Sequence, residues 1–375
     1  MGIDFAAEGL LDGLEGDDRA TRLELLEQLS ADGISLDELR AATRDGRLLF
    51  VGAERMISGI PRYSTRQVSE RAGVSPEFVM ALRRANGLPV PDIDAVVCSE
   101  ADIDGALLAR RFLEAGVSEE QQLAVVRVLG RGLAQAAEVM RATVLELALE
   151  PGASEAQLAR RIAAQVEGFM PLIGPMLEQM ARLHLRHMVR TEAISAAERA
   201  DGMLPGAREV TVAFADLVGF TRLGEEVDAG ELGRVAQRLV GLTVEHLRGQ
   251  VRLVKTIGDA AMLVSPDAPT LLEVALDLVD AADAEGEDFP QLRIGVASGA
   301  ALSRAGDWYG RPVNIASRIT TIARPGSVLA TRAVRDASGN GYRWSSAGAR
   351  SLKGVDEPVR LYRVRRARGE DAEAA

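Results

Sequence analysis

The sequence predicts an α+β protein of two domains, the first all-helical and the second built from alternating strands and helices. The chain has 375 residues, more than one hydrophobic core usually organises. Before about residue 200, apolar residues recur at intervals of three and four, which is the period of a helix. After Pro205 and Gly206 they begin to alternate, which is the period of a strand.

The N-terminal half, residues 1–175, is predicted to be a series of short and medium helices. Leucines such as Leu23, Leu26 and Leu29 lie three apart and would form one apolar stripe on a helix. Glycine and proline separate such stretches, and clusters of β-branched residues are few, which favours helices over strands. We interpret this half as one helical domain.

A linker helix is predicted between the two domains, at residues 176–204. Pro171 and Pro175 interrupt the preceding pattern, because proline lacks the amide hydrogen that a helix interior needs. Residues 176–200 contain neither proline nor glycine and would form one long helix that ends before Gly202.

The C-terminal domain, residues 205–368, is predicted to contain its first six elements in the order βαββαβ. They are a strand around 210–214, a helix at 231–247, strands at 251–256 and 260–264, a helix at 271–282 and a strand at 292–297. Two strand–helix crossovers that flank a hairpin form a ferredoxin-like sheet, with helices on one face and the other face available to a ligand or partner. A helix at 314–321 and further strands would extend this sheet, and residues 369–375 are expected to be a disordered tail.

The composition argues against several classes of protein. A formal net charge of −11 disfavours a surface that coats nucleic acid. No apolar run is long enough to span a membrane, and the N-terminus is acidic, so we expect a cytoplasmic protein with no transmembrane segment. Cys98 is the only cysteine, which excludes an internal disulfide and favours a place in the core over a zinc site.

Two aspartates that follow predicted strands are candidate metal ligands. Asp216 follows the first strand, and Asp259 lies in the turn between the two middle strands. Because the first strand of such a sheet is central and neighbours the hairpin, both carboxylates are expected at one sheet edge. Paired carboxylates suit Mg²⁺ or Mn²⁺, which complete their coordination with water and substrate phosphates. The intervening segment 217–221 would offer backbone N–H groups to a phosphate.

Three separated segments resemble the signature segments of class III nucleotidyl cyclases, in the order and spacing of that family. They are Phe-Ala-Asp-Leu-Val-Gly-Phe-Thr at 214–221, Lys-Thr-Ile-Gly-Asp at 255–259 and Asp-Trp-Tyr-Gly-Arg-Pro-Val-Asn-Ile-Ala-Ser-Arg at 307–318. The resemblance covers residues 208–365, and three such segments are far more specific than a single glycine-rich motif. It identifies the C-terminal domain as similar to a class III cyclase catalytic domain.

The resemblance implies two-metal chemistry on a nucleoside triphosphate. Asp216 and Asp259 would hold two divalent ions, Mg²⁺ or Mn²⁺, in each active site. Asn314 would orient the ribose and Arg318 would meet the charge on the α-phosphate, while the 3′-oxygen attacks in line and expels pyrophosphate. Further substrate contacts are expected from three residues: Phe220, Thr221 and Lys353.

Lys255 and Asp307 occupy the base-selecting positions of the family, and their chemistry favours adenine. A lysine donates to adenine N1 and an aspartate accepts from the N6 amine, whereas guanine presents the reverse pattern. Lys255 and Lys353 are the only lysines among 44 basic residues, and a compact ammonium fits beside a base where a guanidinium would crowd it. The implied substrate is ATP, and the implied product is 3′,5′-cyclic AMP.

The resemblance also implies a homodimer. In the family, the metal aspartates come from one protomer, and the base-selecting, Asn and Arg residues come from the other. This chain carries all of them, so a head-to-tail homodimer would form two equivalent shared sites. An active enzyme is favoured over a catalytically inactive cyclase-like module because six positions match the family: Asp216, Lys255, Asp259, Asp307, Asn314 and Arg318.

The helical half is interpreted as a regulatory domain, because the layout resembles that of bacterial cyclases of this family, including the pH-responsive mycobacterial type. His184 and His187 lie three apart on the predicted linker helix, and histidine is the side chain that changes charge nearest neutrality. Charging them would bias the linker between two packings, with pH as a candidate signal. Two solvated histidines on an amphipathic helix are the simpler alternative.

Residues 64–84 resemble a helix-turn-helix. Gly73 separates two predicted helices, and Ser75 with Pro76 marks the start of the second. Four arginines make the segment basic: Arg66, Arg71, Arg83 and Arg84. The surrounding half is acidic, so we expect no nucleic-acid partner and keep a DNA-binding regulator with a nucleotide-sensing domain as an alternative.

Overall fold

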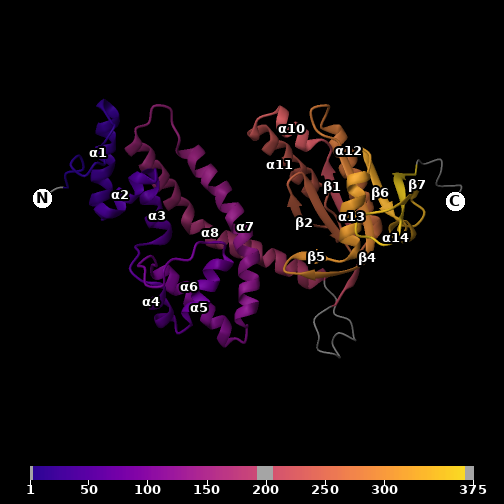
Figure 1. Ribbon diagram of the computed structural model, residues 1–375, viewed down its shortest axis with the longest axis horizontal. Coiled ribbons are helices and arrows are strands. Elements are labelled where there is room, and N and C mark those ends of the chain that lie inside the picture. The colour runs from indigo at the N-terminus through magenta and orange to yellow at the C-terminus, as the bar shows by residue number, and fades with distance from the viewer. Residues whose placement is uncertain (1–2, 192–205, 368–375) are drawn as a thin grey trace. The chain divides into compact units, whose positions relative to one another are not determined.

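The computed structural model describes residues 3–191 and 206–367. These residues belong to two compact units, Met1–Arg190 and Thr191–Ala375, the first helical and the second containing a sheet (Figure 1). The predicted linker after residue 191 and the predicted disordered tail at 369–375 lie outside the described residues.

The first unit is helical, as predicted. Its described elements are α1 (Gly16–Ala31), α2 (Leu36–Arg44), η1 (Leu48–Phe50), α3 (Val51–Ser58), α4 (Thr65–Ala72), α5 (Pro76–Ala85), α6 (Glu100–Glu114), α7 (Glu119–Ala148) and α8 (Glu155–Thr191). Leu26 and Leu29 of the predicted apolar stripe are buried in its core, and Cys98 is buried as expected. Among the described helices of either unit, none combines the length and apolar character needed to cross a bilayer.

The predicted helix pair around Gly73 is confirmed. Ser64 caps α4 and Ser75 caps α5, while Gly73 adopts a left-handed conformation with φ of 68° between them. Three of the four arginines make contacts within the unit: Arg66 with the carboxylate of Asp94, Arg71 with the ring of Tyr63 and Arg83 with the carbonyl of Pro89. These contacts satisfy the arginines without nucleic acid and do not favour the DNA-binding alternative.

The predicted break before the linker helix was wrong. α8 runs continuously from Glu155 to Thr191 and contains Pro171 and Pro175 in its interior. Each proline removes one backbone hydrogen bond, but prolines four residues apart share one face, and the helix continues through both of them over 37 residues. The expected domain boundary at residue 175 therefore falls inside one helix.

The second unit confirms the six predicted elements and extends them. Its described elements are β1 (Arg208–Leu217), α10 (Phe220–Glu226), α11 (Ala229–Glu245), β2 (Arg252–Ile257), β3 (Ala260–Ser265), α12 (Ala268–Ala284), β4 (Leu292–Arg304), β5 (Asp307–Tyr309), α13 (Arg311–Ile322), β6 (Ser327–Thr331), α14 (Arg332–Ala337), β7 (Tyr342–Arg350) and β8 (Val359–Arg366). The strand order is β2-β3-β1-β4-β6-β8-β7, and β5 pairs with β4. β1 lies antiparallel between β3 and β4, as the ferredoxin-like prediction requires.

Helices cover both faces of the central sheet, which corrects the expectation of one open face. Ala213 of β1 belongs to the core cluster that includes α11 and α12. Val212 and Phe214 point to the opposite face, where Ile315 and Ile319 of α13 pack against them. The helix predicted near 314–321 therefore lies on that face, with its apolar residues Ile315 and Ile319 toward the sheet.

Candidate active site

Asp216 lies near the end of β1, opposite Arg293 of β4 in the antiparallel register. The Arg293 Nε atom donates to Asp216 Oδ2 at 2.6 Å, and its Nη2 atom lies 2.5 Å from the same oxygen. The third guanidinium nitrogen, Nη1, donates to the carbonyl oxygen of Thr321 at 3.3 Å, in the last turn of α13. The arginine therefore links the aspartate to two neighbouring elements.

The pKa of Asp216 is raised above its ordinary value of 3.8. Burial is the main cause, the contact with Arg293 opposes it, and the charge of Asp259 adds to the rise. The Asp216 side chain is only 16% exposed. A cation beside a buried carboxylate stabilises its charged form.

Asp259 follows Gly258 in the turn between β2 and β3, next to Asp216 as the sequence predicts. The N–H of Leu217 donates to the Asp259 carbonyl at 3.1 Å, so the two loop ends are joined directly. In residues 3–191 and 206–367, no group of three or more His, Cys, Asp or Glu side chains gathers as a metal cluster. A pair of carboxylates fits Mg²⁺ or Mn²⁺, which take remaining ligands from water and phosphate.

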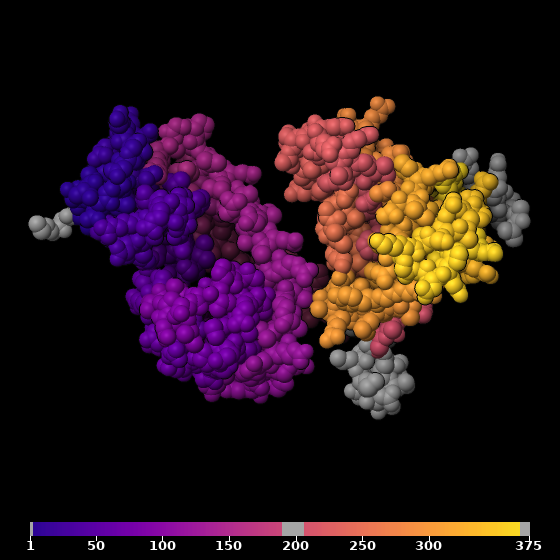
Figure 2. Space-filling view, viewed as in Figure 1, coloured from indigo at the N-terminus to yellow at the C-terminus, as the bar shows by residue number. Residues whose placement is uncertain are grey.

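The predicted phosphate-binding segment is narrower than expected. The N–H groups of Leu217 and Val218 already donate to backbone carbonyls, which restricts the predicted donors to residues 219–221. Gly219 has a φ of 77° and leads into α10. The Phe220 ring packs against the core, whereas Thr221 is exposed, and α10 with α11 forms a lobe at the surface (Figure 2).

Lys255 and Asp307 form an ion pair, although they lie 52 residues apart in the chain. The pairing of β2 with β3 shifts register between Leu253 and Lys255, and such a bulge redirects the side chain beside it. Asp307 begins β5, and its Oδ1 atom accepts a hydrogen bond of 2.8 Å from the N–H of Trp308, whose side chain is buried. Both members of the predicted base-selecting pair are therefore brought together and held.

Asn314 and Arg318 lie one helical turn apart on α13, so they share one side of that helix. Arg318 also lies beside the turn between β7 and β8. A Cβ atom at Gly354 would be 3.6 Å from Arg318 Nη2, and Lys353 is the preceding, exposed residue of that turn. The structure thus brings the two predicted phosphate-binding cations to neighbouring positions.

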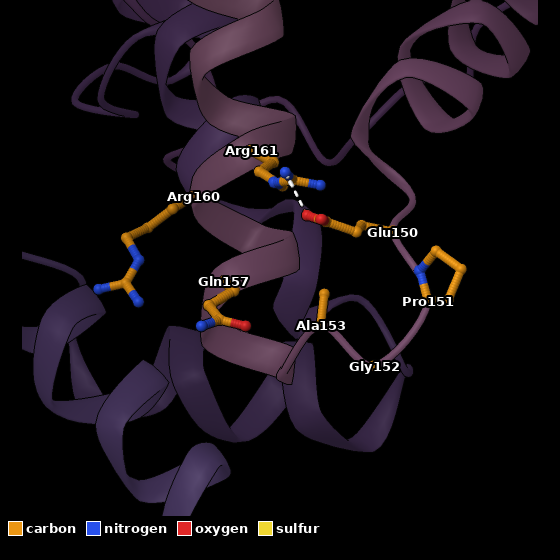
Figure 3. Close-up of a pocket in the computed structure, with 7 residues that line it drawn as sticks. All are labelled: Glu150, Pro151, Gly152, Ala153, Gln157, Arg160 and Arg161. Atoms are coloured by element: carbon orange, nitrogen blue, oxygen red, sulfur yellow. Dashed lines mark ion pairs between the residues drawn. The ribbon is translucent and has the colours of Figure 1, made fainter.

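His184 and His187 are exposed on α8 in the first unit. Neither of two cavities described in that unit includes them. One cavity of about 460 Å³ lies at the turn between α7 and α8, where Arg161 pairs with Glu150 (Figure 3). Another of about 350 Å³ lies among α5, α6 and α7 and has a mainly apolar lining. No predicted site residue lines either cavity.

Arg293 was missed in the sequence, although one signal was available. It interrupts an apolar strand, and a charged side chain in such a strand requires a partner of opposite charge. Nothing in its immediate sequence identifies that partner, because Asp216 lies 77 residues earlier.

Two protein-family models match the chain. An adenylate cyclase regulatory domain matches residues 3–189, and an adenylate and guanylate cyclase catalytic domain matches residues 204–365. A pH-sensitive adenylate cyclase of Mycobacterium tuberculosis is 49% identical over an alignment of 371 residues, which covers 97% of this chain and 92% of the relative. An adenylate cyclase of Streptomyces coelicolor is 34% identical, over 75% of this chain and 71% of the relative.

Among solved structures, the adenylyl cyclase CyaB from P. aeruginosa is similar to this chain at 21% identity and a TM-score of 0.39. The match covers 44% of this chain and 96% of that one. Because the two family models together span nearly the whole chain, and a named relative is 49% identical along it, the chain belongs to the class III adenylate cyclases that carry an N-terminal regulatory domain.

Proposed function

We propose that this adenylate cyclase converts ATP into 3′,5′-cyclic AMP and pyrophosphate at two sites shared between the copies of a homodimer. The contact between Lys255 and Asp307 is the observation that carries the choice of base. An ammonium has three donors, so Lys255 is able to hold Asp307 and still donate to adenine N1. Asp307 then accepts a hydrogen bond from the N6 amine. Guanine would be disfavoured, because its N1 is a donor and would face the Lys255 ammonium, which is also a donor.

The remaining residues act by positioning and charge. Asp216 and Asp259 would hold two divalent ions, Mg²⁺ or Mn²⁺, which when bound neutralise the phosphates and activate the ribose 3′-hydroxyl. Arg318 and the adjacent Lys353 place positive charge where negative charge develops on the phosphates. Asn314 orients the ribose for in-line attack. The N–H groups of residues 219–221 would bind phosphate at the start of α10.

A head-to-tail homodimer would complete two equivalent sites, with the aspartates of one copy facing α13 of the other. The sequence supports this proposal, because one chain carries both the aspartates and the residues of α13. In a symmetric dimer, each copy would therefore contribute its aspartates to one site and its α13 residues to the other.

We further propose that the first unit regulates the enzyme and that pH is its signal. A regulatory-domain model matches residues 3–189, and one relative is named pH-sensitive. His184 and His187 are exposed near the end of α8, where the chain leaves the first unit. Histidine is the side chain whose charge responds to pH nearest neutrality.

The base preference is tested by measuring cyclic nucleotide formed from ATP and from GTP with Mg²⁺ or Mn²⁺. We expect cyclic AMP from ATP and at least about 100-fold less product from GTP. Lys255→Glu combined with Asp307→Ser should reverse this order, while Arg360→Glu, an exposed charge reversal on β8, should preserve it. Equal use of both nucleotides by the unchanged enzyme would refute base reading by this pair, and absence of any product would favour an inactive module.

A further inference from the structure

We propose that Arg293 is a positioning residue for the metal ligand Asp216: it holds one carboxylate oxygen so that the other is presented to the divalent ion. This inference rests on the proposed function, because it concerns the same metal site. The chemistry involved is outer-sphere: the arginine does not bind the ion itself, and acts through the aspartate.

The contact geometry separates the two oxygens of Asp216. Nε of Arg293 donates to Oδ2, and Nη2 also lies against Oδ2. This arrangement leaves Oδ1 for a cation. A ligand carboxylate fixed through one oxygen has fewer orientations to lose when a metal binds the other oxygen.

The guanidinium group is itself held in place. Nη1 donates to the carbonyl oxygen of Thr321, near the C-terminal end of α13, where helix carbonyls carry partial negative charge. α13 is anchored to the sheet by the neighbouring residue, since Thr320 Oγ1 donates to the Phe214 carbonyl at 3.2 Å. The three elements β1, β4 and α13 therefore fix the aspartate through one planar group.

Arg293 would also repel a cation, so the two effects predict opposite outcomes when it is removed. Repulsion alone predicts tighter metal binding by a variant without the arginine. The structure favours a role for Arg293 in orienting the carboxylate. Simple charge compensation would not require two nitrogens of the guanidinium against one carboxylate oxygen, or a third nitrogen bonded to a helix carbonyl. Loss of such an outer-sphere partner typically weakens metal affinity by about 10- to 100-fold.

The experiment measures Mn²⁺ binding to the full chain by the electron paramagnetic resonance signal of free Mn²⁺. Arg293→Gln is expected to weaken binding by about 10- to 100-fold, and Arg293→Lys by less, because an ammonium keeps the charge without the planar fork. Arg238→Gln is the matched control, since Arg238 of α11 pairs with Glu285 at 2.7 Å on the surface and should not affect binding. The Asp216→Asn variant shows how much Mn²⁺ binds when the metal-ligating carboxylate is absent.

Activity gives a second measurement that separates positioning from misfolding. The Arg293→Gln variant should regain cyclase activity as the Mn²⁺ concentration is raised, whereas a folding defect would not respond, and thermal unfolding checks the fold directly. Unchanged or tighter Mn²⁺ binding by Arg293→Gln would overturn the inference. Undiminished Mn²⁺ binding by Asp216→Asn would remove the metal site and the inference with it, while cyclic AMP formation by the unchanged enzyme independently tests the proposed function.

Discussion

Gly295 of β4 shows how one residue places the helix that carries Asn314 and Arg318. A Cβ atom here would lie 2.5 Å from the Ala316 carbonyl oxygen and equally close to the N and Oγ1 atoms of Thr320. No side chain fits at these distances unless the backbone of α13 moves. A glycine at this position therefore sets how closely α13 approaches the sheet.

Gly295→Ala should destabilise the second unit by about 1–3 kcal/mol, because an added methyl group forces α13 away from β4. We expect a lower unfolding temperature by calorimetry and a loss of cyclase activity. Gly233→Ala is the control: this glycine is exposed inside α11, has open space around its Cβ position, and should gain up to about 1 kcal/mol of helix stability. Equal unfolding temperatures for both variants would contradict the packing argument.

Glu38 connects the stability of the first unit to pH. Burial alone would raise the pKa of Glu38, but hydrogen bonds from Ser35 and the guanidinium of Arg55 outweigh it and lower the pKa below its ordinary 4.5. A lowered pKa contributes stability that is fully present above the unfolded-state value and is lost as pH falls through the folded-state value.

Glu38→Gln should therefore reduce the loss of stability between about pH 6 and pH 3, because the amide cannot titrate there. Denaturant unfolding at a series of pH values measures this slope. Glu54→Gln, which removes an exposed partner of Arg47, should keep the slope of the unchanged protein. A steeper slope for Glu38→Gln would show that the direction assigned to the pKa shift is wrong.

At the scale of elements, the periodicity of apolar residues correctly predicted individual helices and strands. The alternation at 210–214 and the helical spacing at 231–247 each gave the correct element, because they report burial of one strand face or one helix stripe. Sequence spacing could not predict which face of the sheet α13 covers, or which residue pairs with Arg293. Both depend on contacts between residues that are distant in the sequence. Continuity of α8 through two prolines was missed because proline disfavours a helix without forbidding it.

α8 is the element to which a pH response is assigned. Replacing both His184 and His187 by Gln in the full chain should alter the pH dependence of cyclic AMP formation between about pH 5.5 and pH 8, because glutamine cannot take up a proton. His246→Gln is the control: His246 Nδ1 contacts the Leu242 carbonyl oxygen at 2.8 Å at the end of α11. An unchanged profile in the double variant would leave the pair as ordinary solvated histidines.

At the scale of the molecule, a helical unit that matches a regulatory domain precedes a catalytic unit with its own cores. A chain that begins at residue 206 should therefore still form cyclic AMP, with a rate or pH profile that differs from that of the full chain. Rates measured side by side across the same pH range decide this. Identical rates and profiles would reduce the first unit to a scaffold.

We propose that each active site is shared between two copies of the chain. Asp216→Ala and Arg318→Ala should each abolish activity alone, because each removes a different half of both sites. Mixing the two variants in equal amounts under exchange should restore about a quarter of the unmixed enzyme's activity, since half of the dimers then contain one intact site of two. That recovery is the result we predict; complete absence of recovery, with dimer exchange shown to occur, would contradict the shared site.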